Sequence, residues 1–268
     1  MRQIPHESHS LKLFGQSQHQ AFAPGKTYQA MSWNIFKSKR KGWQHDFARL
    51  HPMYDLLLLQ EAKINFNQNI DHYDPDYSWL FGESFLLNRC GSSCGVLTGS
   101  RIHHDSAFNL HGPVPEPILK TPKSTAFAYY PVADRDSQML VINSHFINFR
   151  QTLAFQRQLH QVLEVIDLHT GPILFAGDFN TWNARRRRML MEALSEHGLQ
   201  HVAFPDDPRN FLTLDYIFVR GLKISRAELL KDIISSDHKP LSVAFEIPLL
   251  NQDQKQLILP DSQKLNHP

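Results

Sequence analysis

Cysteine, net charge and long apolar runs are all scarce in this chain of 268 residues. Two cysteines cannot cross-link a chain this long, so a disulfide-stabilised scaffold is excluded. The 28 Lys and Arg almost balance the 26 Asp and Glu, and a net charge of +2 excludes a histone-like, tail-driven nucleic-acid binder. The longest purely aliphatic run, Leu56–Leu59, is far below the ~20 residues of a membrane span, and the first residues contain no apolar run of signal-peptide length. We therefore expect a soluble, cytoplasmic protein without a membrane span.

The chain has enough apolar residues for a substantial core. Hydrophobic residues make up 41% of the sequence and aromatic residues 11%, which excludes global disorder. Residues 1–26 and 248–268 are polar and lack clear periodicity, so we expect a loose N-terminal segment and a C-terminal tail. At this length we predict a single domain between them, over residues 27–247.

Short apolar runs alternate with amphipathic segments through the middle of the chain. The runs L-L-L-L and I-L-F-A are continuous, which is typical of strands covered on both faces. We expect strands at residues 28–35, 55–60, 95–100, 124–131, 139–144, 172–176, 214–219 and 241–247. We expect helices at about residues 43–50, 149–169 and 183–197, the two longer ones with an apolar stripe. Many strands with few helices predict an α/β protein in which sheet packs on sheet and helices lie outside.

Short polar motifs stand at the ends of these apolar strands. They are W-N-I with Asn34, L-Q-E with Glu61, N-S-H with His145, G-D-F-N with Asp178 and Asn180, L-D-Y-I-F with Asp215, and S-D-H with Asp237 and His238. Burying such groups costs free energy unless they are paired, coordinated or used in chemistry. Each motif alone has an ordinary explanation, such as a turn cap or a structural histidine. Their number and order together favour a functional site.

The ordered set resembles the endonuclease/exonuclease/phosphatase superfamily, which includes deoxyribonuclease I, abasic-site exonucleases, neutral sphingomyelinases and inositol polyphosphate phosphatases. The resemblance extends over about residues 28–247. Within the superfamily the chain looks closest to a small branch of uncharacterised bacterial proteins, which share its W-N-I-x-K opening, its L-L-L-L-Q-E-A strand and a basic run after the G-D-F-N turn. The resemblance implies a four-layer α/β/β/α sandwich of two mainly antiparallel sheets with outer helices, and motifs on loops at one edge.

The resemblance also implies metal-dependent hydrolysis of a phosphoester by water attack. A hard divalent ion with carboxylate and amide ligands supplies charge stabilisation for that reaction. Glu61 is the expected metal ligand, and Asn34 and Asp237 would complete the protein part of its shell. Mg²⁺ fits these oxygen ligands better than Zn²⁺, and Mn²⁺ is the alternative to Mg²⁺.

Roles for the remaining motif residues follow from the same resemblance. Asp215 would hold one nitrogen of His238, so that the other nitrogen faces the phosphate. Asp178 would accept the proton of the attacking water, and Asn180 would align the water or the phosphate. His145 would hydrogen-bond a phosphoryl oxygen or protonate the leaving group. Which of the two histidines is the general acid stays open.

Lys123 stands at the start of an expected strand. It matches part of a K-G segment that precedes the histidine-motif strand in several phosphodiesterases of the superfamily, where the lysine lies near the scissile phosphate. That match implies a contact between Lys123 and the substrate phosphate. Ser124 stands where glycine is commoner, and the alternative is a solvated lysine at a strand start.

Two runs concentrate the positive charge of the chain. Residues 37–41 and residues 185–188 each carry four positive charges, and each run begins a few residues after a motif. If the motifs meet in one pocket, both runs should rim it and attract nucleic acid. Trp33, Trp43 and Trp182 lie nearby in sequence and could stack on bases. The alternative is a solvated charged face, and at least one of the four arginines must point away because a helix turns ~100° per residue.

We therefore predict a metal-dependent phosphodiesterase, and in particular a nuclease. One alternative is the same chemistry on a phospholipid headgroup or a soluble phosphoester. A membrane-acting enzyme would be expected to show an exposed apolar insertion, for which the short stretch at residues 81–87 is the candidate. A second alternative is an inactive relative that only binds nucleic acid, although every motif position holds a usable residue type. The sequence indicates no protein partner.

Overall fold

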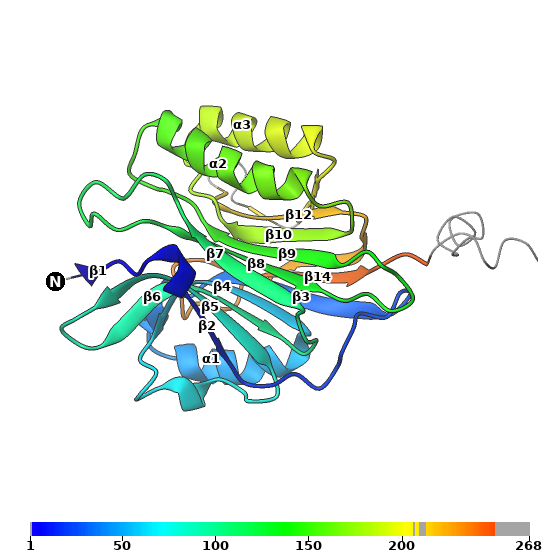
Figure 1. The fold of residues 1–268 in the computed structure, drawn as a ribbon, viewed down its shortest axis with the longest axis horizontal. Coiled ribbons are helices and arrows are strands. Elements are labelled where there is room, and N and C mark those ends of the chain that lie inside the picture. The colour runs from blue at the N-terminus through cyan, green and yellow to red at the C-terminus, as the bar shows by residue number, and fades with distance from the viewer. Residues whose placement is uncertain (1, 206, 209–212, 250–268) are drawn as a thin grey trace, which may run out of the picture.

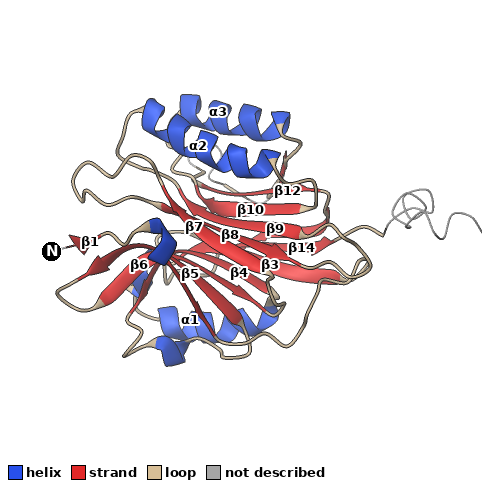
Figure 2. Ribbon diagram, viewed as in Figure 1, coloured by secondary structure: helices blue, strands red, loops and turns tan. Residues whose placement is uncertain are grey.

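Two β-sheets stacked face to face, with helices on both outer sides, make up the computed structural model, which describes residues 2–205, 207–208 and 213–249 (Figures 1 and 2). The first sheet has the strand order β1-β5-β6-β4-β3-β14-β13, with β2 also paired to β5. Its strands are β1 (Arg2–Gln3), β2 (Leu11–Phe14), β3 (Thr27–Asn34), β4 (Leu56–Ile64), β5 (Ser78–Leu87), β6 (Ser92–Ser100), β13 (Lys223–Leu229) and β14 (Leu241–Glu246). Apart from the parallel pair β3 and β4, its described strands pair antiparallel.

The second sheet has the strand order β11-β12-β10-β9-β8-β7. Its strands are β7 (Ser106–His111), β8 (Ser124–Tyr130), β9 (Met139–His145), β10 (Ile173–Asp178), β11 (Gln200–His201) and β12 (Asp215–Arg220). Here β9 and β10 run parallel, and the other described pairs are antiparallel. Both sheets are thus mainly antiparallel, as the family resemblance implies.

The helices form the two outer layers. Helices α2 (Thr152–Asp167) and α3 (Ala184–Glu196) lie over the outer face of the second sheet, and α1 (Trp43–Leu50) lies under the first (Figure 2). Short 3₁₀ turns stand at η1 (Glu7–His9), η2 (Phe36–Ser38), η3 (His51–Met53) and η4 (Ile70–His72). This arrangement confirms the α/β/β/α sandwich. Among the described residues, no helix combines the length and the apolar character that crossing a membrane requires.

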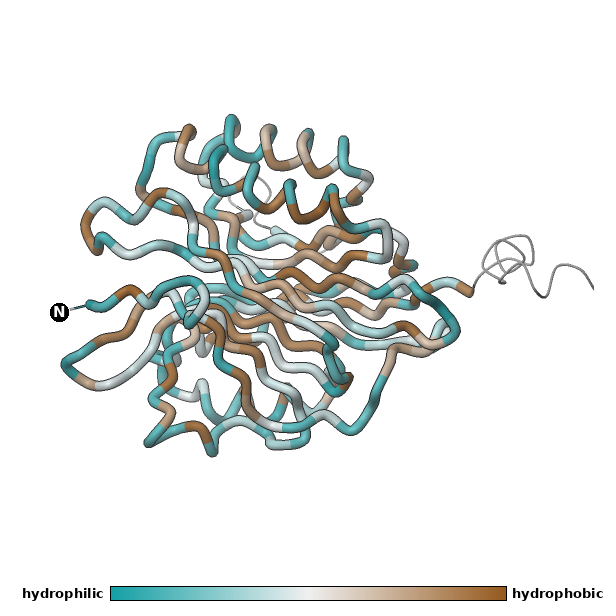
Figure 3. Tube along the Cα trace, in the orientation of Figure 1, coloured by the Kyte–Doolittle hydropathy of each residue, from teal (hydrophilic) through white to brown (hydrophobic). Residues whose placement is uncertain are grey.

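Strand β4 shows why continuous apolar runs occur in this sequence. Leu56 and Leu58 are fully buried in the core between the two sheets, whereas Leu57 and Leu59 are fully buried in the core on the α1 side. Successive side chains of a strand point to opposite faces, so a strand in an inner layer of a sandwich needs apolar residues at every position. In Figure 3 the brown, hydrophobic stretches accordingly follow the central strands.

The N-terminal segment differs from the loose segment that the sequence predicts. Strands β1 and β2 both pair with β5, and the Phe22 side chain is fully buried against the rings of Tyr28, Tyr130 and Phe245. The segment covers the edge that β5 would otherwise expose, which removes a row of unpaired backbone groups. Most of the expected C-terminal tail, residues 250–268, lies outside the described residues.

The structure corrects two further expectations, one about residues 81–87 and one about where the helix expected from residue 149 begins. The stretch at residues 81–87 belongs to β5, where it pairs with β6 and its Phe81 is fully buried, so it is not an exposed insertion. The helix expected from residue 149 begins at Thr152, because Gln151 has an extended backbone (φ −61°, ψ 157°). The residues between β9 and α2 thereby form a loop at the sheet edge.

Candidate active site

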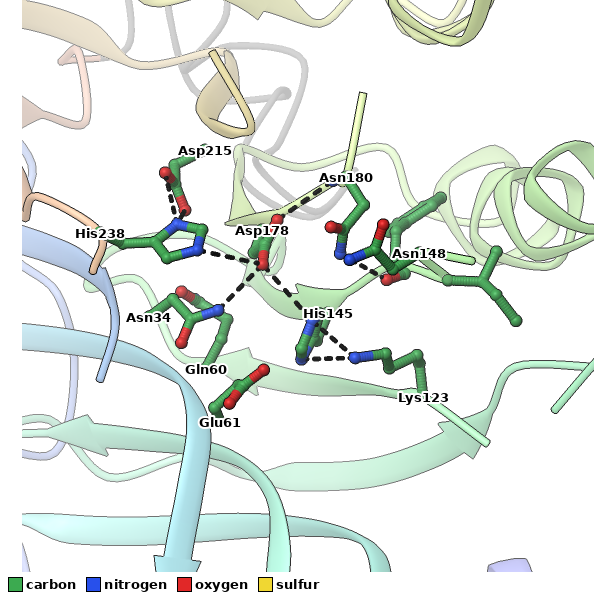
Figure 4. Close-up of polar contacts among 12 residues, drawn as sticks. Asn34, Gln60, Glu61, Lys123, His145, Asn148, Asp178, Asn180, Asp215 and His238 are labelled. Atoms are coloured by element: carbon green, nitrogen blue, oxygen red, sulfur yellow. Dashed lines mark hydrogen bonds and ion pairs between the residues drawn. The ribbon is translucent and has the colours of Figure 1, made fainter. Parts of the chain in front are cut away.

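The motif residues gather at one edge of the sandwich because of strand register. Asp178, the last residue of β10, is the register partner of His145, the last residue of β9, and of Asp215, the first residue of β12. In the facing sheet Asn34 ends β3, and Glu61 lies in an irregularity of the neighbouring β4. The stacked sheets bring these two sets of strand ends together (Figure 4).

Asp178 is the centre of this cluster and is 2% exposed. Its Oδ2 accepts a hydrogen bond of 2.9 Å from the side-chain amide of Asn34, and lies 3.4 Å from Nε2 of His145 and 3.9 Å from Nε2 of His238. Its Oδ1 accepts a hydrogen bond of 3.1 Å from the backbone N–H of Asn180. Asn34 and His145 at strand ends, and Asn180 and His238 in loops, thus converge on one carboxylate, as Figure 4 shows.

The environment of Asp178 makes its carboxylate more basic than usual. Burial raises the pKa of Asp178 to about 6, and the nearby Asp215 acts in the same direction, while His238, Lys123 and Asn34 oppose the shift. At neutral pH such a group is ionised, yet it holds a proton more readily than an exposed aspartate does. That combination suits a general base.

His238 and Asp215 form a tight pair. Nδ1 of His238 lies 2.9 Å from both carboxylate oxygens of Asp215, which leaves Nε2 directed at Asp178. Burial alone would lower the pKa of His238, but Asp215, aided by Asp178 and Asp237, raises it to about 10. The imidazole is therefore positively charged at neutral pH. Trp33 fixes its backbone by donating a hydrogen bond of 3.1 Å to the His238 carbonyl.

His145 is the opposite case. Burial, followed by the charges of Lys123, Lys37 and His238, holds its pKa well below the usual range, so the ring is neutral. Lys123 Nζ lies 2.8 Å from its Nε2, and an ammonium can only donate in that contact. Burial also lowers the pKa of Lys123 itself. The two histidines carry different charges because Asp215 outweighs the effect of burial on His238, whereas burial and the nearby ammonium groups act in the same direction on His145.

Glu116 is a member of this network that sequence reasoning missed. It is 5% exposed, and its Oε1 lies 3.8 Å from Lys123 Nζ. Its carboxylate also accepts hydrogen bonds from the backbone N–H groups of Asn148 (2.9 Å) and Phe149 (3.3 Å), so it anchors the loop between β9 and α2. It lies in a loop before β8, away from any recognisable motif, and only the three-dimensional contact identifies it.

Glu61 reaches the same site from the first sheet. Its backbone is in the left-handed region at φ 52°, as is that of Asn180 at φ 51°. Such conformations are costly for residues other than glycine and cluster at functional sites. Lys37 donates to the Glu61 carboxylate. Burial would raise the pKa of Glu61, but the charges of Lys37, Lys123 and His238 outweigh that effect and lower it.

The oxygen-rich donor set fits a hard divalent cation. Glu61 presents an ionised, partly exposed carboxylate, and the exposed Asp237 lines the wall of the same cavity. Asn34 is more constrained, because its amide donates to Asp178 and its Oδ1 accepts from the N–H of Phe36 at 3.1 Å. A second group of donors, from Asp178, Asp215 and His238, lies within 4.8 Å of one another.

A cavity of about 480 Å³ connects these groups. Seven of the nine residues singled out in the sequence line it, namely Glu61, Lys123, His145, Asp178, Asn180, Asp237 and His238. The other two do not line the cavity but contact residues that do: Asn34 donates to Asp178, and Asp215 pairs with His238. The structure thus brings all nine into one site.

The two basic runs have different positions. From the run at residues 37–41, Lys37 lines the site cavity and an adjacent cavity that Arg40 and Lys41 also line. From the run at residues 185–188, Arg185 and Arg188 line a separate cavity with Glu192 and Glu196 on α3. The expectation that both runs rim the site is therefore wrong for these two arginines, because the turn of the helix carries them away.

Arg186, from the same run, is fully buried beneath the site loops. Its Nη1 donates to the carbonyls of Ile147 (2.9 Å) and Asn180 (3.1 Å), and its Nη2 donates to the carbonyl of Arg150 (2.5 Å). The guanidinium therefore joins the loop after β9 to the loop after β10. It supports the backbone that carries Asn180 rather than facing solvent.

The tryptophans also separate into two kinds. Trp33 and Trp43 are 1% and 3% exposed in the core around α1, so neither can stack on a base. Trp182 is 51% exposed and packs over the Arg186 guanidinium at 5.1 Å. Of the three tryptophans singled out in the sequence, Trp182 alone is exposed, and stacking on a base stays a prediction for it.

Comparison with known proteins agrees with this architecture. The sequence model of the Endonuclease/Exonuclease/phosphatase family matches residues 31–238. A UPF0294 protein of Vibrio cholerae serotype O1 is 34% identical over 221 residues, covering 80% of this chain and 76% of that protein. The crystal structure of endonuclease/exonuclease/phosphatase from Beutenbergia cavernae (TM-score 0.64, 18% identity) covers 83% of this chain and 72% of its own. The structure of D. rerio TDP2 complexed with single strand DNA product (TM-score 0.59, 15% identity) matches 82% of this chain and 99% of the TDP2 chain. The family match and the shared fold together show that this chain belongs to the endonuclease/exonuclease/phosphatase family.

Proposed function

We propose that this protein is a divalent-metal-dependent phosphodiesterase that cleaves its substrate by water attack. The observation that carries the proposal is the convergence of Asn34, His145, Asn180 and His238 on the single buried carboxylate of Asp178. A carboxylate held in this way, with a pKa raised to about 6, suits proton abstraction from water in a site that also holds positive charge.

Asp178 is the proposed general base. Hydrogen bonds from Asn34 and from the backbone of Asn180 fix both of its oxygens, so the carboxylate is aimed before substrate binds. Such preorganisation lowers the reorganisation that would otherwise accompany the reaction. The Asn180 side chain donates to the carbonyl of Phe146 at 2.9 Å. This bond holds the loop that follows Asp178 against the loop that follows His145.

Positive charge for the phosphoryl oxygens comes from two directions. His238 is charged because Asp215 holds its Nδ1, and its Nε2 points into the cavity. Lys123 lies on the facing wall beside the neutral His145. We assign His238 to charge stabilisation and proton donation, and Lys123 to phosphate binding, with His145 as their hydrogen-bonding neighbour.

The proposed metal ion is Mg²⁺, with Mn²⁺ as a substitute. Glu61 is its proposed main ligand, with Asp237 and Asn34 beside it. When bound, a hard cation at this position supplies Lewis-acid stabilisation of the phosphate charge. The Glu61 carboxylate accepts a hydrogen bond from the Lys37 ammonium, and this affinity for a cationic group supports its assignment as a metal ligand.

Nucleic acid is the proposed substrate class. The support is the placement of Lys37, Arg40 and Lys41 at and beside the site, since clustered lysines and arginines attract a polyanion. The bound single-stranded DNA of D. rerio TDP2 shows that this fold accommodates such a ligand in that protein. The proposal is tested with a panel of single-stranded DNA, duplex DNA, abasic DNA, RNA, sphingomyelin and inositol phosphates, each with Mg²⁺ and with EDTA. Metal-dependent turnover confined to the lipid or the inositol phosphates would contradict a nuclease.

A further inference from the structure

The site cavity, called here the catalytic cavity, has a neighbouring cavity on each sheet. The aromatic flank, of about 780 Å³, is built by loops of the second sheet and the first turns of α2, and it shares Phe149 with the catalytic cavity. The basic flank, of about 600 Å³, is built by segments around α1 and β4 of the first sheet and shares Lys37 with it. The two flanks are therefore each adjacent to the catalytic cavity, separated from it by one shared wall residue.

The aromatic flank combines exposed rings with arginines. Phe149 is 70% exposed and Trp182 is 51% exposed, so two large aromatic side chains of this cavity face solvent. Trp182 is held in place because its ring packs over Arg186 and its Nε1 donates to the Asn148 carbonyl at 3.4 Å. Arg150 and Arg157 line the same cavity.

The basic flank is lined by Arg40, Lys41 and Lys63 in addition to the shared Lys37. Among the described residues, no carboxylate lines either flank. Lys37 is paired with Glu61 in the catalytic cavity, but Arg40, Lys41 and Lys63 have no carboxylate beside them on this wall, and such positive charge attracts an anion that extends beyond the catalytic cavity. A small phosphoester would occupy only the middle cavity and would leave both flanks without a role.

We infer that the three cavities form one track for a single-stranded nucleic acid, whose scissile phosphate is internal to the strand. This inference rests on the proposed phosphodiesterase function. Exposed aromatic rings between arginines bind unpaired bases by stacking, while lysines and arginines follow the backbone phosphates. A duplex keeps its bases stacked inside and offers no free face to Phe149 and Trp182. A lipid would explain the exposed rings but not the basic flank on the other side of the site.

Binding of fluorescent 12-nucleotide single-stranded DNA by the full-length protein tests the track. We expect the double variant F149A/W182A to weaken binding by at least about tenfold, since stacking is worth that much per base. The aromatic exchange F149W/W182F keeps both stacking faces and should bind nearly as well as the native protein. Thermal melts of each variant show whether any loss comes from misfolding, and the aromatic exchange separates the two causes.

Charge variants test the two flanks separately. R150S/R157S should weaken binding, and R40S/K41S/K63S should also reduce the slope of log K against log[salt] by about 2, as the loss of three phosphate contacts to a single strand predicts. The matched control R185S/R188S removes two arginines from the separate α3 cavity and should leave both affinity and slope unchanged. An equal effect of the control and of R150S/R157S would overturn the track.

The lipid alternative and the proposed function have their own readouts. Binding to vesicles of phosphatidylcholine and phosphatidylglycerol that is lost in F149A/W182A, with DNA binding intact, would overturn the track in favour of a membrane surface. Higher affinity for duplex than for single-stranded DNA would overturn it as well. Hydrolysis of bis-p-nitrophenyl phosphate reports on the phosphodiesterase alone, so loss of the track and loss of the proposed function give different results.

Discussion

The side-chain amide of Asn34 and the carboxylate of Asp178, 144 positions apart in the chain, share a hydrogen bond of 2.9 Å that joins the ends of two sheets. Asn34 ends β3 of the first sheet, and Asp178 ends β10 of the second. Both side chains are at most 2% exposed. The orientation of the proposed base thus depends on how the two sheets stack.

Removal of the Asn34 amide should therefore impair catalysis through Asp178. We expect N34A to lower kcat by about 10²-fold, and D178N by about 10³-fold, in the range typical of a lost general base or its support. The double variant should be scarcely slower than D178N, because residues that act as a unit give non-additive effects. Steady-state kinetics on bis-p-nitrophenyl phosphate measure all three. Strictly multiplicative losses would show that Asn34 acts independently of Asp178.

The pair of Asp215 and His238 makes a second prediction. D215N keeps a side chain of the same shape but no longer stabilises the charged imidazole, so kcat should fall by about 10²-fold or more. S225A removes a hydroxyl that donates to the carbonyl of Ala244 at 3.4 Å, outside the residues that build the site, and it serves as a control with unchanged kcat. Native-like turnover by D215N would remove His238 from the proposed charge-stabilising role.

Metal binding should follow the Glu61 carboxylate. We expect E61Q to weaken Mg²⁺ or Mn²⁺ binding by at least tenfold in calorimetry without substrate, because an uncharged amide is a poorer ligand for a hard cation. K37M should not weaken binding, since it removes the ammonium with which the ion would compete for Glu61. Weaker binding in K37M than in E61Q would place the ion elsewhere.

Although Arg186 belongs to the basic run at residues 185–188, we expect it to stabilise the fold and not to bind substrate. R186M leaves three backbone carbonyls without their donor, and we expect a loss of about 2–4 kcal/mol in the free energy of unfolding, measured by urea titration. R185S, on the exposed side of α3, should change it by less than about 0.5 kcal/mol. Similar values for the two variants would contradict the supporting role of Arg186.

Acid should destabilise the fold in part through His104, which is 8% exposed, with Nδ1 lying 3.2 Å from Oγ of Ser78. Burial, with His103 beside it, lowers the pKa of His104 below its ordinary value of 6.5. The unfolded chain then binds a proton more readily than the folded one as the pH falls through 6.5, so this contribution to stability is lost below that pH. The melting temperature should drop less between pH 8 and pH 5.5 in H104Q than in the native protein. An equal drop would exclude His104 as a source of the acid sensitivity.

The sequence predicts much of the architecture because its signals are local. Continuous apolar runs such as Leu56–Leu59 reveal strands buried on both faces, and most of the polar motifs stand at or near strand ends, whereas Glu61 lies within β4. Strand β13 was not among the expected strands, because its exposed positions are polar and its pairing with β14 has no local signature. Strands β1 and β2 were not expected either, because each is short and forms by pairing with β5, which is remote in the chain.

In the site, too, the sequence identifies residues that lie in local motifs and misses residues that act through contacts distant in the chain. Asp178 and His238 are visible in the sequence because they lie in ordered motifs, whereas Glu116 and Arg186 act through backbone groups of loops that are remote in the chain. The arginine run looked like a binding surface, yet a helix distributes its members around an axis. Contacts of this kind follow from packing and not from residue type.

The most direct test of the account is the turnover of bis-p-nitrophenyl phosphate by the native protein and by D178N, each with Mg²⁺ and with EDTA. The account predicts metal-dependent hydrolysis by the native protein, abolished by EDTA and reduced by about 10³-fold in D178N. Equal turnover by D178N and the native protein in the presence of Mg²⁺ would contradict the assignment of Asp178 as the base around which the site is built.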